Sequence, residues 1–154
     1  MKSASKLIIF LLLLSLFPTS LYAADKSNTV MTTQSNKTFV RINDYYLIYT
    51  YPQAPFIDQN RRFMVPLRAV GDLMSAEVSY DASSKKAGLK FAEHSVSVTI
   101  GSKKAEIDGS LVQMDTVPQL IKQSVYVPLR ILIQGFKLEV NTTIPNVIWL
   151  EDER

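Results

Sequence analysis

The sequence contains no cysteine and only one histidine, His94, in 154 residues. Without cysteine the chain has no disulfide, no thiol nucleophile and no cysteine for lipid attachment. A single histidine also excludes any metal centre built from several imidazoles. A Ser/His/Asp triad would have to use His94, which we expect to be a solvated residue in a turn at 93–95. These absences argue against the commonest catalytic centres.

Net positive charge is scarce once the first segment is set aside. Lys2 and Lys6 precede an apolar run, Leu7–Leu14, and a stretch of small residues ends near Ala23. This order predicts a secretory signal peptide at 1–23, whose apolar run is too short to span a bilayer comfortably. Its removal lowers the formal charge from +3 to +1, which excludes the basic footprint of a nucleic-acid-binding protein. We expect a secreted product, extracellular or associated with the cell wall, with no membrane span after cleavage.

The segment after the signal peptide has few apolar side chains. Residues 24–38 are mostly Ser, Thr, Asn and Gln, which predicts a flexible linker. Residues 39–152 are rich in β-branched and aromatic residues and are numerous enough to bury a core without disulfides. The sequence therefore predicts one folded domain at 39–152.

One short motif occurs twice. Residues 64–68 read MVPLR, and residues 126–130 read YVPLR. Proline suits the first position of a helix, because an N–H at that position would have no partner within the helix. Apolar residues follow each motif at helical spacing, which predicts two short helices that each bury one face. The motif residues are Val65, Pro66, Leu67 and Arg68 in the first copy, and Val127, Pro128, Leu129 and Arg130 in the second.

The similarity between the two halves extends beyond this motif. Hairpin turns are predicted at 43–44 and 108–109, ahead of the two motifs, and two strands follow each predicted helix. The unit of hairpin, turn, strand, helix, strand and strand is thus used twice, over about 39–91 and 104–150. Because each copy is too small to be stable alone, we expect one shared core. The predicted fold class is α+β, with a mostly antiparallel sheet curled around two short helices.

The two motif arginines need an explanation, because a cation in the first turn of a helix faces the positive end of the macrodipole. In the structural interpretation, Arg68 and Arg130 are largely buried, and each guanidinium ties its helix to a carbonyl or carboxylate of a neighbouring strand. In the functional interpretation, the arginines contact an anion or a carbohydrate. We favour the first, because a duplicated residue at a duplicated joint is explained most simply by the joint.

The residues around the first motif also carry a family likeness. The stretch 55–58 reads PFID and is followed by Asn60-Arg61, the first Val-Pro-Leu-Arg, a strand at 77–81 and the second Val-Pro-Leu-Arg. Over roughly 39–150 the chain resembles the copper amine oxidase N-terminal-like domain, the "stalk" domain of many secreted and surface proteins of Gram-positive bacteria. The resemblance implies an α+β fold with an antiparallel sheet curled around helix, and a non-catalytic accessory module.

The chain departs from the family pattern in two places. Ser75-Ala76 lacks the glycine that is usual before the Glu-Val strand, and residues 141–143 stand where an aromatic-Asp pair is common. Copper catalysis remains excluded by the single histidine. Copper(I) could instead use thioether ligands, but we expect Met64, Met74 and Met114 to lie in the core.

Four tyrosines form the main candidate contact surface. They are Tyr45, Tyr46, Tyr49 and Tyr51, and strand alternation places Tyr46 on the face opposite the other three. Exposed tyrosines would suit stacking on sugar rings or on a protein partner. We favour core packing for most of them. Basic pairs at 61–62, 85–86 and 103–104 could meet anionic wall polymers, but we favour solvated loops for them.

The sequence leaves one enzymatic alternative open. Paired carboxylates could form a hydrolase acting on wall polysaccharide if some of the acidic side chains converge, namely Asp58, Asp72, Glu77, Asp81 and Glu139. Each also has a simpler role as turn former, helix-surface charge or arginine partner. The function that we predict is a secreted, non-catalytic binding or spacer module at the cell envelope. It would need no cofactor or metal, and its partner would be a cell-wall polymer or a surface protein.

Overall fold

The computed structural model describes residues 38–48 and 52–152. The signal peptide predicted at 1–23 and all but the last residue of the predicted linker lie outside the described residues, as do Tyr49 and Tyr51. Among the residues that are described, no helix has the length and apolar character needed to cross a membrane.

The described chain alternates short strands with two eight-residue helices. The elements in chain order are β1 Phe39–Ile42, β2 Tyr45–Leu47, β3 Phe56–Ile57, β4 Phe63–Pro66, α2 Leu67–Met74, β5 Glu77–Asp81, β6 Lys86–Phe91, β7 His94–Thr99, β8 Lys104–Ile107, β9 Ser110–Gln113, β10 Gln119–Ile121, β11 Ser124–Pro128, α3 Leu129–Phe136, β12 Glu139–Asn141 and β13 Val147–Glu151.

The strands form three sheets. Sheet A has the order β12-β13-β1-β2, sheet B the order β10-β11-β4-β3, and sheet C the order β5-β6-β7-β8-β9. All pairs are antiparallel except β1 with β13. The fold is therefore α+β with mostly antiparallel sheets, as predicted, but with three sheets where one was expected. The reason is that each helix starts directly at the end of a sheet B strand, so the chain leaves sheet B and its next strand joins another sheet.

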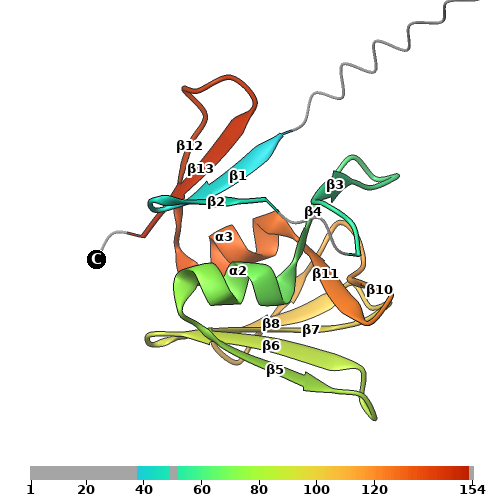
Figure 1. The fold of residues 1–154 in the computed structure, drawn as a ribbon. Coiled ribbons are helices and arrows are strands. Elements are labelled where there is room, and N and C mark those ends of the chain that lie inside the picture. The colour runs from blue at the N-terminus through green and yellow to red at the C-terminus, as the bar shows by residue number, and fades with distance from the viewer. Residues whose placement is uncertain (1–37, 49–51, 153–154) are drawn as a thin grey trace, which may run out of the picture. The chain divides into compact units, whose positions relative to one another are not determined.

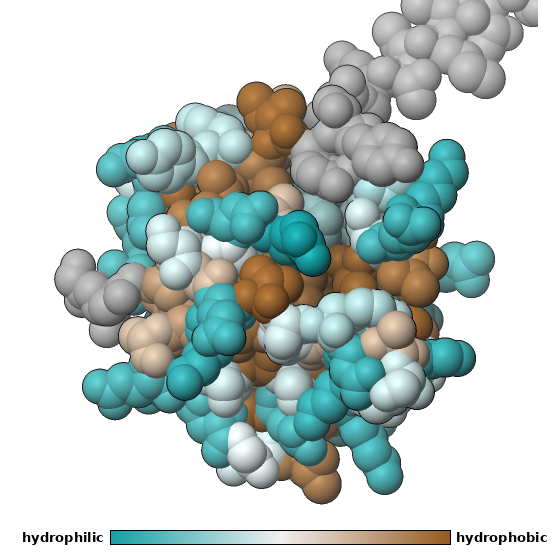
Figure 2. Space-filling view, turned by 60° about the horizontal axis from the view of Figure 1, so that its bottom comes forward, coloured by the Kyte–Doolittle hydropathy of each residue, from teal (hydrophilic) through white to brown (hydrophobic). Residues whose placement is uncertain are grey.

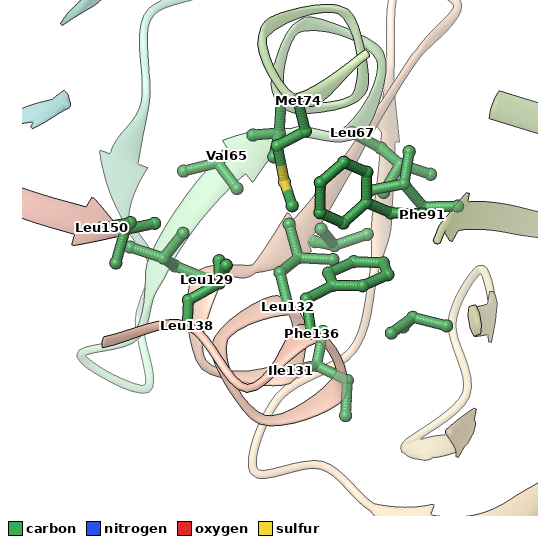
Figure 3. Packing of buried hydrophobic residues seen from close by; sticks show 14 of the residues in the cluster. Val65, Leu67, Met74, Phe91, Leu129, Ile131, Leu132, Phe136, Leu138 and Leu150 are labelled. Atoms are coloured by element: carbon green, nitrogen blue, oxygen red, sulfur yellow. The ribbon is translucent and has the colours of Figure 1, made fainter. Parts of the chain in front are cut away.

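The two helices lie between sheet A and sheet C, and sheet B closes one side of this arrangement (Figure 1). Side chains from both helices and from all three sheets meet in one apolar core (Figure 3). Within it, the rings of Phe91 from β6 and Phe136 from α3 pack edge to face with centroids 6.0 Å apart. Met64, Met74 and Met114 are buried, which confirms their predicted core positions.

The two motif copies pair with each other at the centre of sheet B. Val65 of β4 lies opposite Val127 of β11, and both are 0% exposed. Pro66 and Pro128 have extended backbone with ψ near 119° and 128°, and each is the residue before its helix. The helices were predicted to start at the prolines and in fact start one residue later. The extended ψ keeps each proline in its strand, so the helical turn begins at leucine.

Each helix ends in a left-handed residue, Ser75 with φ 55° and Lys137 with φ 53°. After α2, the N–H of Ala76 donates to the carbonyl of Gly71 at 2.8 Å, which closes the last turn. Glycine is the usual residue at such a position, because it has no Cβ to clash there. The first of the two departures from the family pattern, at Ser75, is thus a strained helix end.

Candidate functional site

The outer face of sheet A carries a group of aromatic side chains around one arginine. Val40, Ile42 and Leu150 point into the core, so alternation turns Arg41 and Trp149 outward. We call the outward residues the aromatic face. Its members are Phe39 and Arg41 of β1, Tyr46 of β2 and Trp149 of β13.

Arg41 lies between two rings of this face, those of Trp149 and Tyr46. In the register of the sheet it is opposite Trp149 on one side and Tyr46 on the other. Its Cζ lies 4.2 Å from the Trp149 ring centroid and 5.8 Å from the Tyr46 centroid. A guanidinium nitrogen also donates to Asp44 Oδ1 at 3.2 Å. Cation–π contacts of this kind contribute about 0.5–1 kcal/mol each, so the rings are held in place before any ligand arrives.

Much of the aromatic face is open to solvent. Phe39 is 39% exposed and Tyr46 is 47% exposed, while Trp149 is half-buried. Tyr45 is 63% exposed as well, although it belongs to the opposite face, because β2 is the edge strand of sheet A. The expectation that most of the tyrosines pack in the core is therefore wrong for Tyr45 and Tyr46.

Trp149 was missed as a candidate from the sequence. It stands in the run Val147–Leu150, in which every residue is apolar and which resembles a fully buried strand. Only the parallel pairing with β1, 108 positions earlier at Arg41, shows that Trp149 faces outward beside a cation. The run itself holds no signal for this outward orientation.

Arg68 and Arg130 are both exposed, so the prediction that they are buried against neighbouring strands is wrong. A nitrogen of Arg130 lies 3.4 Å from Asp115 Oδ2, and Arg62 reaches the same oxygen at 2.8 Å. The Arg68 side chain makes no hydrogen bond or ion pair with any residue in 38–48 or 52–152. The physical reason is that each short helix begins at the protein surface, where the second residue points to solvent.

Asp58 of the family-like stretch shapes the turn between β3 and β4. Its side chain accepts hydrogen bonds from the backbone N–H groups of Asn60 at 2.9 Å and Arg62 at 2.8 Å, and from the hydroxyl of buried Thr116. Partial burial opposes ionisation of Asp58, but the bonds from Thr116, Arg62 and Asn60 outweigh it and lower the pKa. Asp58 is thus a turn former that joins sheet B to the segment before β10.

Two of the other candidate carboxylates, Asp81 and Glu139, lie far apart. Hydrogen bonds from Ser83 and Ser84 hold Asp81 in a turn and lower its pKa to about 2. Glu139 lies in sheet A and Asp81 at the end of β5 in sheet C, on opposite sides of the helices (Figure 1). Glycoside hydrolysis needs two carboxyl groups within about 10 Å of each other. The separation of Asp81 and Glu139 therefore excludes these two as a catalytic pair.

His94 was expected to be a solvated turn residue. It is instead the first residue of β7. Its Nδ1 lies 2.7 Å from Asp108 Oδ2, and its side chain is 27% exposed. In the described part of the chain, no group of three His, Asp or Glu side chains could hold a metal ion. With one imidazole, engaged by a carboxylate, and buried thioethers, the donor set does not fit a copper centre.

Comparison with known proteins addresses the family. Residues 41–146, more than half of the chain, match the model of the copper amine oxidase N-terminal domain. A search of curated proteins returned no match. The matched range contains both motif copies, both helices, the Asp58 turn, Arg41 and Tyr46. The chain belongs to the copper amine oxidase N-terminal domain family.

Proposed function

We propose that this protein is a secreted, non-catalytic binding module of the cell envelope, and that the aromatic face of sheet A binds wall polysaccharide. The observation that carries the proposal is the placement of Arg41 between Trp149 and Tyr46. The signal peptide predicted at 1–23 supports secretion, and the predicted linker at 24–38 would connect it to the domain.

The chemistry of the aromatic face suits a sugar ring. Pyranose rings present flat C–H surfaces that stack on aromatic side chains, and their hydroxyl groups accept hydrogen bonds from a guanidinium. Phe39 and Tyr46 offer exposed apolar area, and Arg41 offers donors between two rings. Because the cation–π contacts already fix the rings, binding would immobilise few side chains, which reduces its entropic cost.

The same proposal includes a tandem origin of the fold. The order β1-β2-β3-β4-α2-β5-β6 recurs as β8-β9-β10-β11-α3-β12-β13. Sheet A joins the hairpin β1-β2 to β12-β13, and sheet C joins β5-β6 to β8-β9 through β7. Each of these sheets combines hairpins from both halves of the chain, which supports one shared core. Neither half should fold alone, and circular dichroism of a fragment covering about 39–91 checks this.

The binding proposal is tested by fluorescence, because Trp149 is the only tryptophan of the chain. Soluble fragments of wall polysaccharide should change its emission in a saturable way. Tyr46→Ala should weaken binding about tenfold, as expected for loss of an aromatic anchor. Leu111→Ala is the matched control, because Leu111 is 72% exposed on sheet C and away from the aromatic face. Unchanged emission with all fragments would leave only the spacer role.

A further inference from the structure

A second candidate site lies beside the start of α2. A cavity of about 140 Å³ opens there between the helix, strands β5 and β6, and the turn that leads into β11. Its apolar wall is formed by Leu67, Val78, Ala87 and Val125. The polar residues that matter at its edge are Arg68, Asp72, Tyr80 and Ser124.

The cavity at the start of α3 is the natural comparison. It measures about 150 Å³ and is lined by Arg62, Asp115 and Arg130 among others. Asp115 contacts both arginines there, at 2.8 and 3.4 Å. Arg130, the motif arginine of the second half, therefore has a carboxylate partner within the same chain.

Arg68 has no such partner within the described residues. Asp115 stands in the connection between β9 and β10, and the corresponding connection between β2 and β3 spans 48–55. The sequence of 48–55 contains no Asp or Glu. The first half of the chain thus supplies no carboxylate from the equivalent connection to the equivalent arginine.

We propose that the cavity at Arg68 binds the terminal carboxylate of a peptide whose last side chain is small and apolar. Arg68 would take the place beside a carboxylate that Arg130 takes beside Asp115, and an Arg–carboxylate pair is strong when it is bidentate. The cavity is well below the roughly 300 Å³ of a typical small-molecule site, so it admits about one small residue. The apolar wall gives that side chain a place to bury.

Asp72 is the one acidic residue lining this cavity, one helical turn after Arg68. It forms no ion pair with Arg68. Its charge opposes an incoming carboxylate, although solvent screens it because Asp72 is exposed. Asp72→Asn should therefore tighten binding about two- to fivefold.

The test is a titration of the purified protein, followed by NMR of backbone amides. The probes are N-acetyl-alanyl-alanine, its C-terminal amide, and acetate. The dipeptide with a free carboxylate should shift the backbone amide signals of Tyr80 and Ser124, with saturation in the millimolar range. The amidated dipeptide should bind at least about tenfold more weakly. Arg68→Gln should lose at least about tenfold. The matched control Arg130→Gln, also at an exposed helix start, should stay within about twofold.

Several outcomes would overturn the proposal. Equal shifts with the free dipeptide and the amidated dipeptide would show that the carboxylate charge is not recognised. If acetate bound as tightly as the dipeptide, the apolar wall would contribute nothing to binding. No shift up to about 50 mM would exclude the site at any useful affinity. Equal losses in the two arginine variants would also contradict it. None of these results bears on the aromatic face, because Phe39, Arg41, Tyr46 and Trp149 do not line this cavity.

Discussion

Sheets A and C are both built from antiparallel hairpins on either side of the helices, yet their outer faces differ. On sheet C, Lys86 Nζ lies 2.7 Å from Glu106 Oε2, and the Ser97 hydroxyl donates to the same oxygen at 2.9 Å. On sheet A, the corresponding central position holds Arg41 between two rings. The Lys86–Glu106 pair of sheet C is satisfied within the protein and faces water, whereas the rings of sheet A hold apolar area that a ligand could cover.

Figure 2 shows the side of the molecule on which sheet C lies. There, hydrophobic side chains form separate patches between hydrophilic ones (Figure 2). Scattered exposed apolar residues are normal on a monomer and need no partner. The difference teaches that the two sheets share a way of folding but not a role at the surface.

The largest expected effect concerns stability on the sheet A side. Trp149→Ala removes a half-buried ring and its contact with Arg41, so it should lower the free energy of unfolding by about 2–4 kcal/mol. Lys86→Ala removes only an exposed pair on sheet C and should cost less than about 1 kcal/mol. Denaturant unfolding of both variants measures the difference. Equal losses in the free energy of unfolding would contradict the proposed difference between sheets A and C.

One glycine of each helix packs against the inner face of sheet C. A methyl group on Gly135 would overlap Val96 of β7, and one on Gly71 would overlap Val78 and Leu89 of β5 and β6. Gly71→Ala and Gly135→Ala should each cost about 1–3 kcal/mol by overpacking, in spite of the higher helix propensity of alanine. Thermal melts check this. Unchanged melting would show that the helices do not pack as closely on sheet C as described.

The helix ends should behave alike although they lead to different sheets. Ser75 precedes β5 of sheet C, and Lys137 precedes β12 of sheet A, both in left-handed conformation. Ser75→Gly and Lys137→Gly should each raise the free energy of unfolding by up to about 1 kcal/mol, because glycine adopts this conformation without steric cost. A gain at only one end, in matched urea titrations, would show that the two exits are not equivalent.

The smallest effect is a pH dependence on sheet C. The hydrogen bonds from Lys86 and Ser97, with the positive charge of Lys86, lower the pKa of Glu106 from its ordinary value of 4.5. Because the pKa of Glu106 is lower in the folded state, its carboxylate stabilises the fold above pH 4.5. This stabilisation is lost as the pH falls through the pKa of the folded state. Glu106→Gln should flatten the acid limb of the stability profile below that pH. An unchanged limb would mean that the Lys86–Glu106 pair contributes nothing.

The sequence predicted those parts of the fold that local signals determine. Proline followed by apolar residues at helical spacing located the start of both helices to within one residue, and Asp108-Gly109 located the hairpin of β8 and β9. The division into three sheets was not predicted. It depends on which distant strands pair, and β1 with β13 has no local signal in either strand.

The candidate site was predicted in part. The tyrosines of β2 were identified as contact residues, but core packing was preferred for them because aromatic residues on a strand are usually buried. Their exposure follows from the edge position of β2, which only the topology reveals. The predicted burial of Arg68 and Arg130 was wrong for a related reason. Helix spacing does not tell which side of the first turn faces solvent.

The central claim is that the aromatic face of sheet A binds wall polysaccharide, and co-sedimentation with insoluble wall polysaccharide tests it most directly. Wild type and Leu111→Ala should sediment with the polymer equally. Tyr46→Ala, which melts within a few degrees of wild type because its ring is about half exposed, should remain in the supernatant. Equal sedimentation of Tyr46→Ala and wild type, or no sedimentation of wild type, would contradict the account.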